Sequence, residues 1–239
     1  MSLGRKLVVE FIGTFFLVFT VGMATKTAGS FAPLAIGAVL MVMVFAGGHV
    51  SGAHYNPAVS TAVFLRGKLS FREYVPYIVT QILAGAAAAG VVIALGYDSV
   101  APARTGAIGS MLVVEFLFSF AVSFVVLNVA TARGTEGNSF YGLAIGFTVA
   151  AGAFAGGPIS GGAFNPAVGI GPILVSAVLG SQGSLANLWL YLLGPFVGGA
   201  LAAAVYRVQQ PAEATPQEAL TARADLGEAV PSSRRRAQA

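Results

Sequence analysis

Charged residues are scarce in this sequence. Of the 239 residues only 9% are charged, whereas 56% are hydrophobic, and the mean hydropathy is +0.81. Soluble domains carry roughly a quarter charged residues, so this chain has too few charges to cover a globular surface in water. The composition therefore indicates that lipid surrounds most of the chain.

Cysteine is absent altogether. A chain without cysteine has no disulfide framework and no thiolate site, and its redox compartment stays undetermined. The two histidines, His49 and His54, are five residues apart, but no cysteine or nearby carboxylate completes a metal site. The sequence therefore predicts neither a bound metal nor a cofactor.

Signals for nucleic-acid binding and for catalysis are also missing. The formal net charge is +4, but three basic residues form one run at 234–236 and the others separate apolar segments. The sequence contains no glycine-rich phosphate loop, no nucleophile triad and no paired catalytic carboxylates. We therefore expect neither a nucleic-acid partner nor an enzyme.

Long apolar runs are what the sequence does contain. A helix that spans a bilayer needs about 20 mostly apolar residues, and six stretches approximate this length: 7–24, 32–48, 74–95, 111–131, 140–156 and 185–206. The first follows "MSLGRK" as a signal peptide would, but it carries Glu10 and lacks a clear small-x-small cleavage site. We interpret it as a retained helix.

The lysines and arginines predict the orientation. With a cytoplasmic N-terminus, eleven of the 13 fall in inside segments, and only Lys26 and Arg104 lie outside. Positive charge accumulates on the cytoplasmic side, so we expect both termini in the cytoplasm and the protein in the cell membrane, plasma or inner. Residues 208–239 are rich in Pro, Ala, Glu and Gln and predict a disordered cytoplasmic tail.

Two segments of the chain are nearly the same. "SGAHYNPAVS" at 51–60 returns about 110 positions later as "SGGAFNPAVG" at 160–169, and "VVEFIGTFFLVF" at 8–19 matches "VVEFLFSFAVSF" at 113–124. The chain thus consists of two similar halves, each with three spans. Because three is odd, the second half enters the membrane from the opposite side, which is an inverted repeat.

Each repeated motif predicts the start of a short helix. Asn is a favoured N-cap and Pro is well accepted at the first helical position. The apolar segments that follow are too short to span, so we expect two re-entrant half-helices. The preceding stretches, "GGHVSG" and "GGPISGG", are expected to be non-helical, which at membrane depth requires burial or a water-filled cavity. The predicted fold is an all-α membrane protein with six transmembrane helices and two re-entrant half-helices in an inverted repeat.

Two such descents that meet on a symmetry axis imply a pore. Helix N-termini at its centre disfavour cations and protons, and backbone carbonyls offer acceptors to a neutral molecule. The predicted constriction is Asn56, Pro57, Ala58, Asn165, Pro166 and Ala167, and the predicted carbonyl ladder is Gly52, Ala53, His54, Gly161, Gly162 and Ala163.

Glu10 and Glu115 are ionisable groups within spans, and such groups are functional by default. A proton relay is one interpretation. We prefer a structural role, in which each carboxylate accepts hydrogen bonds from the descending loop of its own half.

The sequence resembles the aquaporin, or major intrinsic protein, family. "GHVSGAHYNPAV" is similar to the signature of that family, and the second Asn-Pro-Ala, the two Glu-bearing spans, "YIVTQILAGAAAA" and "YLLGPFVGGALAA" also fit it. The resemblance covers residues 5–207 and implies a channel domain at 1–207 with halves at 5–105 and 106–207. It also implies a homotetramer in the lipid bilayer, with one pore per subunit and no cofactor.

The resemblance further implies a narrow filter of four residues near the extracellular mouth. Carried over by spacing from the two motifs, the positions are Ile36, Ala153, Gly162 and Val168. Val168 replaces the arginine that the family usually has there, which removes a cationic barrier and a fork of donors. We therefore expect a wide, apolar filter that passes small neutral solutes, namely glycerol, urea or undissociated metalloid acids, together with water.

Two other functions fit the same pattern. Inverted repeats with broken helices also build secondary transporters, although the spans contain no charge apart from the two Glu. A structural membrane protein with a closed pore is the second alternative.

Overall fold

The computed structural model describes residues 1–97, 101–102, 106–179 and 185–210. Within them, six helices are long and apolar enough to cross a membrane, and no strand is present. The long helices are α1 (Leu3–Thr27), α2 (Ala32–Ser51), α4 (Phe71–Ala94), α5 (Ile108–Val126), α6 (Tyr141–Ser160) and α8 (Leu188–Gln209); the short ones are α3 (Pro57–Leu65) and α7 (Pro166–Val178). The predicted fold is confirmed. Apart from its first residues, the predicted tail lies outside the described part.

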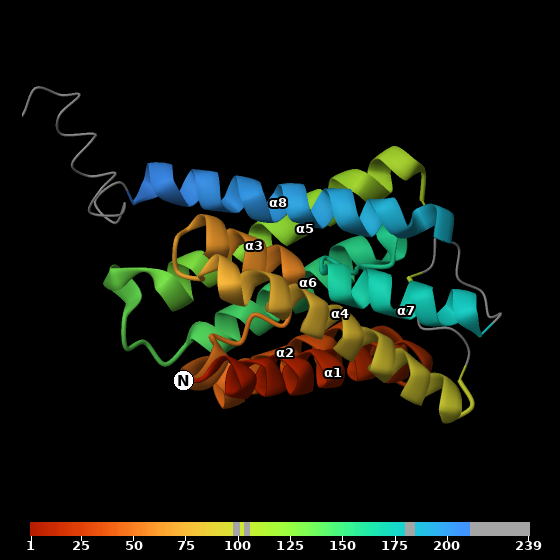
Figure 1. Cartoon of the computed structure of the whole chain (residues 1–239). Helices are drawn as coiled ribbons and strands as arrows, with labels where there is room; N and C mark the ends of the chain where they lie inside the picture. Colours follow the sequence, from red (N-terminus) through yellow and green to blue (C-terminus); the bar gives the residue numbers. More distant parts are fainter. Residues whose placement is uncertain (98–100, 103–105, 180–184, 211–239) are drawn as a thin grey trace, which may run out of the picture.

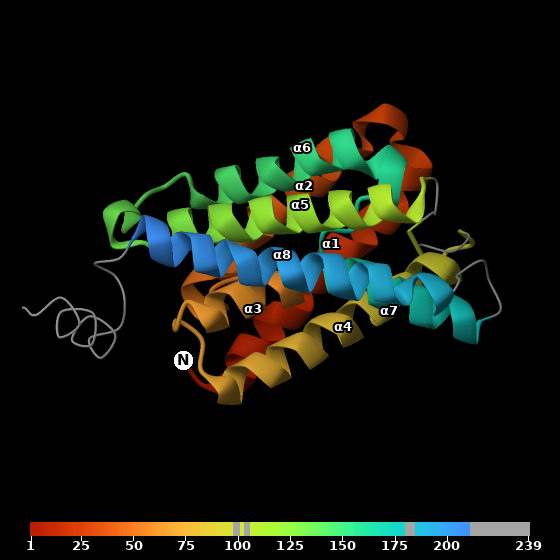
Figure 2. The ribbon, with the colours of Figure 1, turned by 90° about the horizontal axis from the view of Figure 1, so that it is seen from above.

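The long helices form a bundle, and the two short helices enter it from opposite ends (Figures 1 and 2). The halves exchange these short helices. α3 of the first half packs against α8 of the second, and α7 of the second half packs against α4 of the first. Each half therefore supplies part of the other's interior.

The stretches before the half-helices differ from the sequence prediction. α2 continues to Ser51 and α6 to Ser160, so most of the two glycine-rich stretches is helical. Tertiary contacts override the low helix propensity of glycine here; the Tyr55 hydroxyl fills the space where a Cβ of Gly47 would lie. Both helices end at left-handed glycines, Gly52 with φ 86° and Gly161 with φ 85°, which is a common way to end a helix.

The half-helices begin with the predicted caps. Asn56 is extended, and its Oδ1 accepts a hydrogen bond of 2.8 Å from the Ala58 N–H. Asn165 accepts the corresponding 2.9 Å bond from the Ala167 N–H. A side-chain cap of this kind stabilises a helix by about 1 kcal/mol.

Two glycines seat the half-helices. A Cβ at Gly85 of α4 would collide with the Ala167 carbonyl, and one at Gly199 of α8 would collide with the Ala58 carbonyl. The first turn of each half-helix thus rests against the bare backbone of a helix from the other half.

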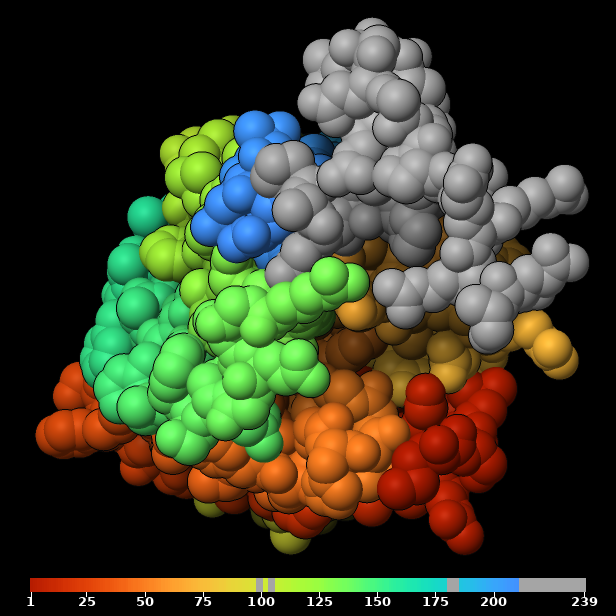
Figure 3. Space-filling view, turned by 90° about the vertical axis from the view of Figure 1, so that its left-hand side faces the viewer, coloured from red at the N-terminus to blue at the C-terminus, as the bar shows by residue number. Residues whose placement is uncertain are grey.

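Both described termini and the α5–α6 connection lie at the same end of the bundle, which we call the terminal face (Figures 1 and 3). The connection contains a π-turn (Leu127–Thr131) and a 3₁₀ turn (Arg133–Thr135). The Thr135 hydroxyl donates to the Asn128 carbonyl (2.6 Å), and the Asn138 amide donates to the Val129 carbonyl (2.7 Å). Side chains thereby satisfy carbonyls at the end of α5.

Candidate functional site

The two half-helices are joined at their tips by a pair of hydrogen bonds. The Asn56 amide donates to the Phe164 carbonyl (3.0 Å), and the Asn165 amide donates to the Tyr55 carbonyl (2.9 Å). Each Asn therefore caps its own helix with its oxygen and binds the opposite loop with its nitrogen. We call this pair of bonds the Asn clasp.

Glu10 lies fully buried beside the first loop. Its Oε1 accepts hydrogen bonds from the Ser51 hydroxyl (2.7 Å) and the His54 N–H (3.0 Å). Its Oε2 accepts from the Tyr55 N–H and from the Gln81 amide, both at 2.8 Å. Four donors compensate for the burial of this carboxylate, as a buried charge requires.

Glu115 repeats the arrangement in the second half, where it is also fully buried. Its Oε1 accepts from the Ser160 hydroxyl (2.7 Å) and the Ala163 N–H (3.0 Å), and its Oε2 accepts from the Phe164 N–H (2.7 Å). No counterpart of Gln81 is present, because the corresponding residue is Pro195.

These bonds determine where the loop carbonyls point. In a trans peptide the C=O is opposed to the N–H of the next residue. The N–H groups of 53–55 and 162–164 donate to Ser51, Ser160 and the two glutamates, so the carbonyls before them face the other way. Within the described residues these six carbonyls accept no protein hydrogen bond; they belong to Gly52, Ala53, His54, Gly161, Gly162 and Ala163.

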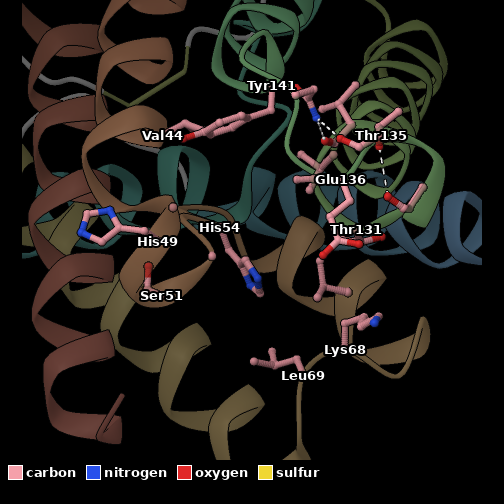
Figure 4. Close-up of a pocket in the computed structure, with 18 of the residues that line it drawn as sticks. Val44, His49, Ser51, His54, Lys68, Leu69, Thr131, Thr135, Glu136 and Tyr141 are labelled. Carbon is pink, nitrogen blue, oxygen red and sulfur yellow. Dashed lines mark hydrogen bonds between the residues drawn. The ribbon is translucent and has the colours of Figure 1, made fainter.

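The structure contains two neighbouring spaces that share lining residues. A cavity of about 690 Å³ opens on the terminal face, and its lining includes His49, Lys68, Thr131 and Glu136 (Figure 4). A passage of only about 20 Å³ runs beside Asn56 and Asn165, which is room for roughly one water. His54 and Val126 line both spaces, and we call the place where these two residues lie the neck.

The four predicted filter positions are only partly brought together. Ile36, Gly162 and Val168 line the passage, whereas Ala153 does not, and Val149, one turn earlier in α6, lines it instead. The passage is apolar at these positions, as predicted. Ile36, Val149 and Val168 contribute branched aliphatic side chains to its lining.

The two neighbouring phenylalanines differ in their position: Phe164 is among the residues that line the passage, and Phe154 is not. Phe154 is 54% exposed on the outer surface. The Phe164 ring packs against Phe118, with ring centroids 5.0 Å apart, and against Gly152 and Gly156 of α6.

Several residues of the site were not singled out by the sequence. Ser51 and Ser160 each bind a buried carboxylate, and the hydroxyls of Tyr77 and Tyr191 donate to the carbonyls of these serines at 2.8 Å and 2.7 Å. All four occupy matching positions in the two halves. Aligning the halves with each other would therefore have found them.

Comparison with known proteins agrees with the fold. The model of the family described as "Major intrinsic protein" matches residues 1–206. Aquaporin NIP1-4 of Oryza sativa subsp. japonica is 40% identical over 214 residues, which is 84% of this chain and 76% of the relative. Nodulin-26 of Glycine max is 34% identical over 219 residues, which is 85% of this chain and 77% of the relative.

One solved structure has the same architecture. The X-ray structure of the aquaglyceroporin from Plasmodium falciparum matches with a TM-score of 0.75 and covers 92% of this chain and all of that one. At 20% identity this likeness shows the fold alone. The family model and the plant relatives go further, and they show that the chain belongs to the major intrinsic protein family, the family of the aquaporins.

Proposed function

We propose that the protein is a passive channel that conducts water and small neutral solutes, namely glycerol, urea or undissociated metalloid acids, through the passage beside the Asn clasp. One observation carries the proposal. Two rows of backbone carbonyls without protein partners precede two oppositely directed helix N-termini. Gly52 and His54 of the first row line the terminal-face cavity, whereas Gly162 and Ala163 of the second row line the passage. Relatives whose names call them aquaporins support the same class of function, and members of this family are channels rather than enzymes.

The chemistry of the passage favours neutral cargo. Carbonyl oxygens accept hydrogen bonds from the solute, and the second N–H of each Asn amide is available to donate to it. The half-helix N-termini carry positive partial charge, which opposes cations. Because no carboxylate, lysine or arginine lines the passage among the described residues, an ion would lose its hydration without compensation.

The predicted site residues have corresponding roles in this proposal. Glu10 and Glu115 hold the loops, and the constriction is the two Asn-Pro-Ala motifs. The proposed filter consists of Ile36, Gly162 and Val168 together with Val149, whereas Ala153, which the spacing also predicts, does not line the passage. Cargo with three carbon atoms then requires the branched side chains to move aside.

The assembly and orientation also belong to the proposal. We place the terminal face in the cytoplasm of a plasma or inner membrane, because Arg5, Lys6, Lys68 and Arg133 lie at that end. We also propose a homotetramer with one passage per subunit, which membership in the family supports.

Stopped-flow measurements on proteoliposomes test the function. With glycerol or urea outside, wild-type vesicles should shrink and re-swell faster than empty ones, with low activation energy and without response to a proton gradient. Val168→Arg should reduce glycerol and urea flux more than water flux, since it adds bulk and charge to the passage. Re-swelling no faster than that of empty vesicles would contradict conduction of these solutes, and steep saturation coupled to protons would indicate a carrier.

A further inference from the structure

A chain of buried polar side chains joins Glu10 to His54 in the first half only. Gln81 Nε2 lies 2.8 Å from Glu10 Oε2 and 3.0 Å from Ser60 Oγ, and Ser60 Oγ lies 3.1 Å from His54 Nδ1. In the second half the matching residues are Ala163, Gly169 and Pro195, whose side chains form no hydrogen bonds. The second half supports its loop without such a chain of side chains. Support of the loop alone therefore does not explain why the first half has one.

The direction of each hydrogen bond follows from the carboxylate. Glu10 can only accept, so Gln81 must turn its Nε2 towards it, and the same nitrogen then donates to Ser60. The Ser60 proton has two acceptors within reach, His54 Nδ1 at 3.1 Å and Gln81 Oε1 at 3.4 Å. The imidazole nitrogen is the nearer one.

An imidazole that accepts at Nδ1 carries its proton elsewhere. Neutral histidine has a single N–H, so a bond from Ser60 to Nδ1 leaves the proton on Nε2. The groups that face the ring are Glu10 of α1, through this chain, and Tyr77 of α4, whose ring centroid is 5.2 Å away. On the Nε2 side lies Gly52, where even a Cβ would be 3.1 Å from that nitrogen.

We propose that Gln81 and Ser60 are positioning residues that hold neutral His54 as its Nε2–H tautomer, so that the neck presents a hydrogen-bond donor to passing solute. His54 lines both the cavity and the passage, and its ring lies among the residues that line the cavity in Figure 4. With the loop carbonyls as acceptors, the neck serves solutes that both accept and donate, as hydroxyl and amide groups do. The interaction of the neck with solute rests on the proposed channel function, whereas the tautomer of His54 does not depend on that function.

Nitrogen NMR of the full chain in lipid tests the tautomer directly. The chain has two histidines, so His49→Gln leaves a single imidazole to observe with ¹⁵N-histidine label. In samples alkaline enough that the ring is neutral, we expect the proton on Nε2 and an Nδ1 signal typical of a hydrogen-bonded acceptor. A proton on Nδ1 would overturn the proposal without the need for any further variant.

Variants of this chain of polar side chains, which we call the Gln81–Ser60 relay, then test the positioning role. Gln81→Leu should shift the Nδ1 signal and introduce the second tautomer, whereas Tyr77→Phe, which removes a buried hydroxyl beside the same ring but outside the relay, should leave the tautomer unchanged. An unaltered Nδ1 signal in Gln81→Leu would show that the relay does not set the tautomer.

Flux measurements distinguish failure of the proposed donor at the neck from failure of the proposed channel function. His54→Phe keeps a ring but no N–H, and we expect its glycerol flux to fall by about twofold to tenfold relative to water, which is what one net hydrogen bond is worth. An unchanged ratio would overturn the donor at the neck. Wild type that conducts nothing would overturn the channel and leave the tautomer result standing.

Discussion

At the scale of single residues, the loops depend on unusual backbone conformations that side chains compensate. Ala53, Tyr55 and Phe164 have φ near +50° although they are not glycines, which costs about 1–3 kcal/mol each. The N–H groups of Tyr55 and Phe164 donate to buried carboxylates, and hydrogen bonds to charged groups contribute about 1.5–3 kcal/mol. Glu10 and Glu115 thus offset the strain of the loops that they contact.

Replacement of either carboxylate should lower stability before it changes selectivity. In Glu115→Gln, the NH₂ group faces at least one donor that needs an acceptor. The free energy of unfolding should therefore fall by about 1.5–3 kcal/mol or more, and we expect the same for Glu10→Gln. Thermal unfolding in detergent measures it.

Glu73→Gln is the matched control. Glu73 pairs with Lys6 at 2.7 Å, but both side chains are about a quarter exposed, and such pairs contribute about 0–1 kcal/mol. Gln also preserves the capping box with Ser70. Equal losses for Glu115→Gln and Glu73→Gln would contradict a special role for the buried carboxylate.

At the scale of elements, the half-helices are positioned by what lies beside them. α3 and α7 have caps that the sequence predicts, because an Asn followed by Pro is a local signal. Their contacts with Gly199 and Gly85 join segments that are distant in the sequence. These contacts could not be predicted, because a glycine in a helix does not indicate which carbonyl packs against it. For the same reason the helical ends of α2 and α6 were not predicted. In α2 the contact of Gly47 with Tyr55 outweighs propensity, and in α6 Gly156 is closely packed against Val114 and Phe164.

Replacement of a contact glycine by alanine should test how the half-helices are positioned. Gly85→Ala should displace α7, because its Cβ collides with the Ala167 carbonyl; we expect a lower unfolding temperature and reduced solute flux. Gly90→Ala is the control on the same helix, since nothing lies within 4 Å of its Cβ, and Ala there should be neutral or stabilising by up to about 1 kcal/mol. Equal behaviour of the two variants would mean that the position of α7 does not depend on the close approach of Gly85 to the Ala167 carbonyl.

At the scale of the whole molecule, the Asn clasp unites two halves that the sequence could only describe as similar. Composition and the repeat were sufficient to predict six spans, two half-helices and their opposite entry. The sequence also singled out Asn56 and Asn165, but not that each amide binds the other half, because the partners are backbone carbonyls without a side-chain signature. The sequence also did not single out Val149, which lines the passage, because no motif marks it.

Asp in place of Asn separates the two roles of the clasp residues. Asn56→Asp keeps an oxygen that caps α3 but loses the donor to the Phe164 carbonyl, and Asn165→Asp does the same for α7 and Tyr55. We expect each variant to reach the membrane at near-normal abundance with flux reduced at least tenfold, since a carboxylate would face a carbonyl at the junction. Full flux in vesicles with either variant would remove the clasp from the mechanism.

The exchange of short helices has a consequence for biogenesis. The seat of α3 includes Gly199, about 140 residues downstream of Ala58, and ribosomes add roughly 5–20 residues per second. The first half-helix, α3, is therefore complete on the order of ten seconds before α8, against which it packs, is synthesised. During that delay the polar backbone at the start of α3 cannot face acyl chains. The insertion machinery therefore has to keep it away from lipid until α8 has been synthesised.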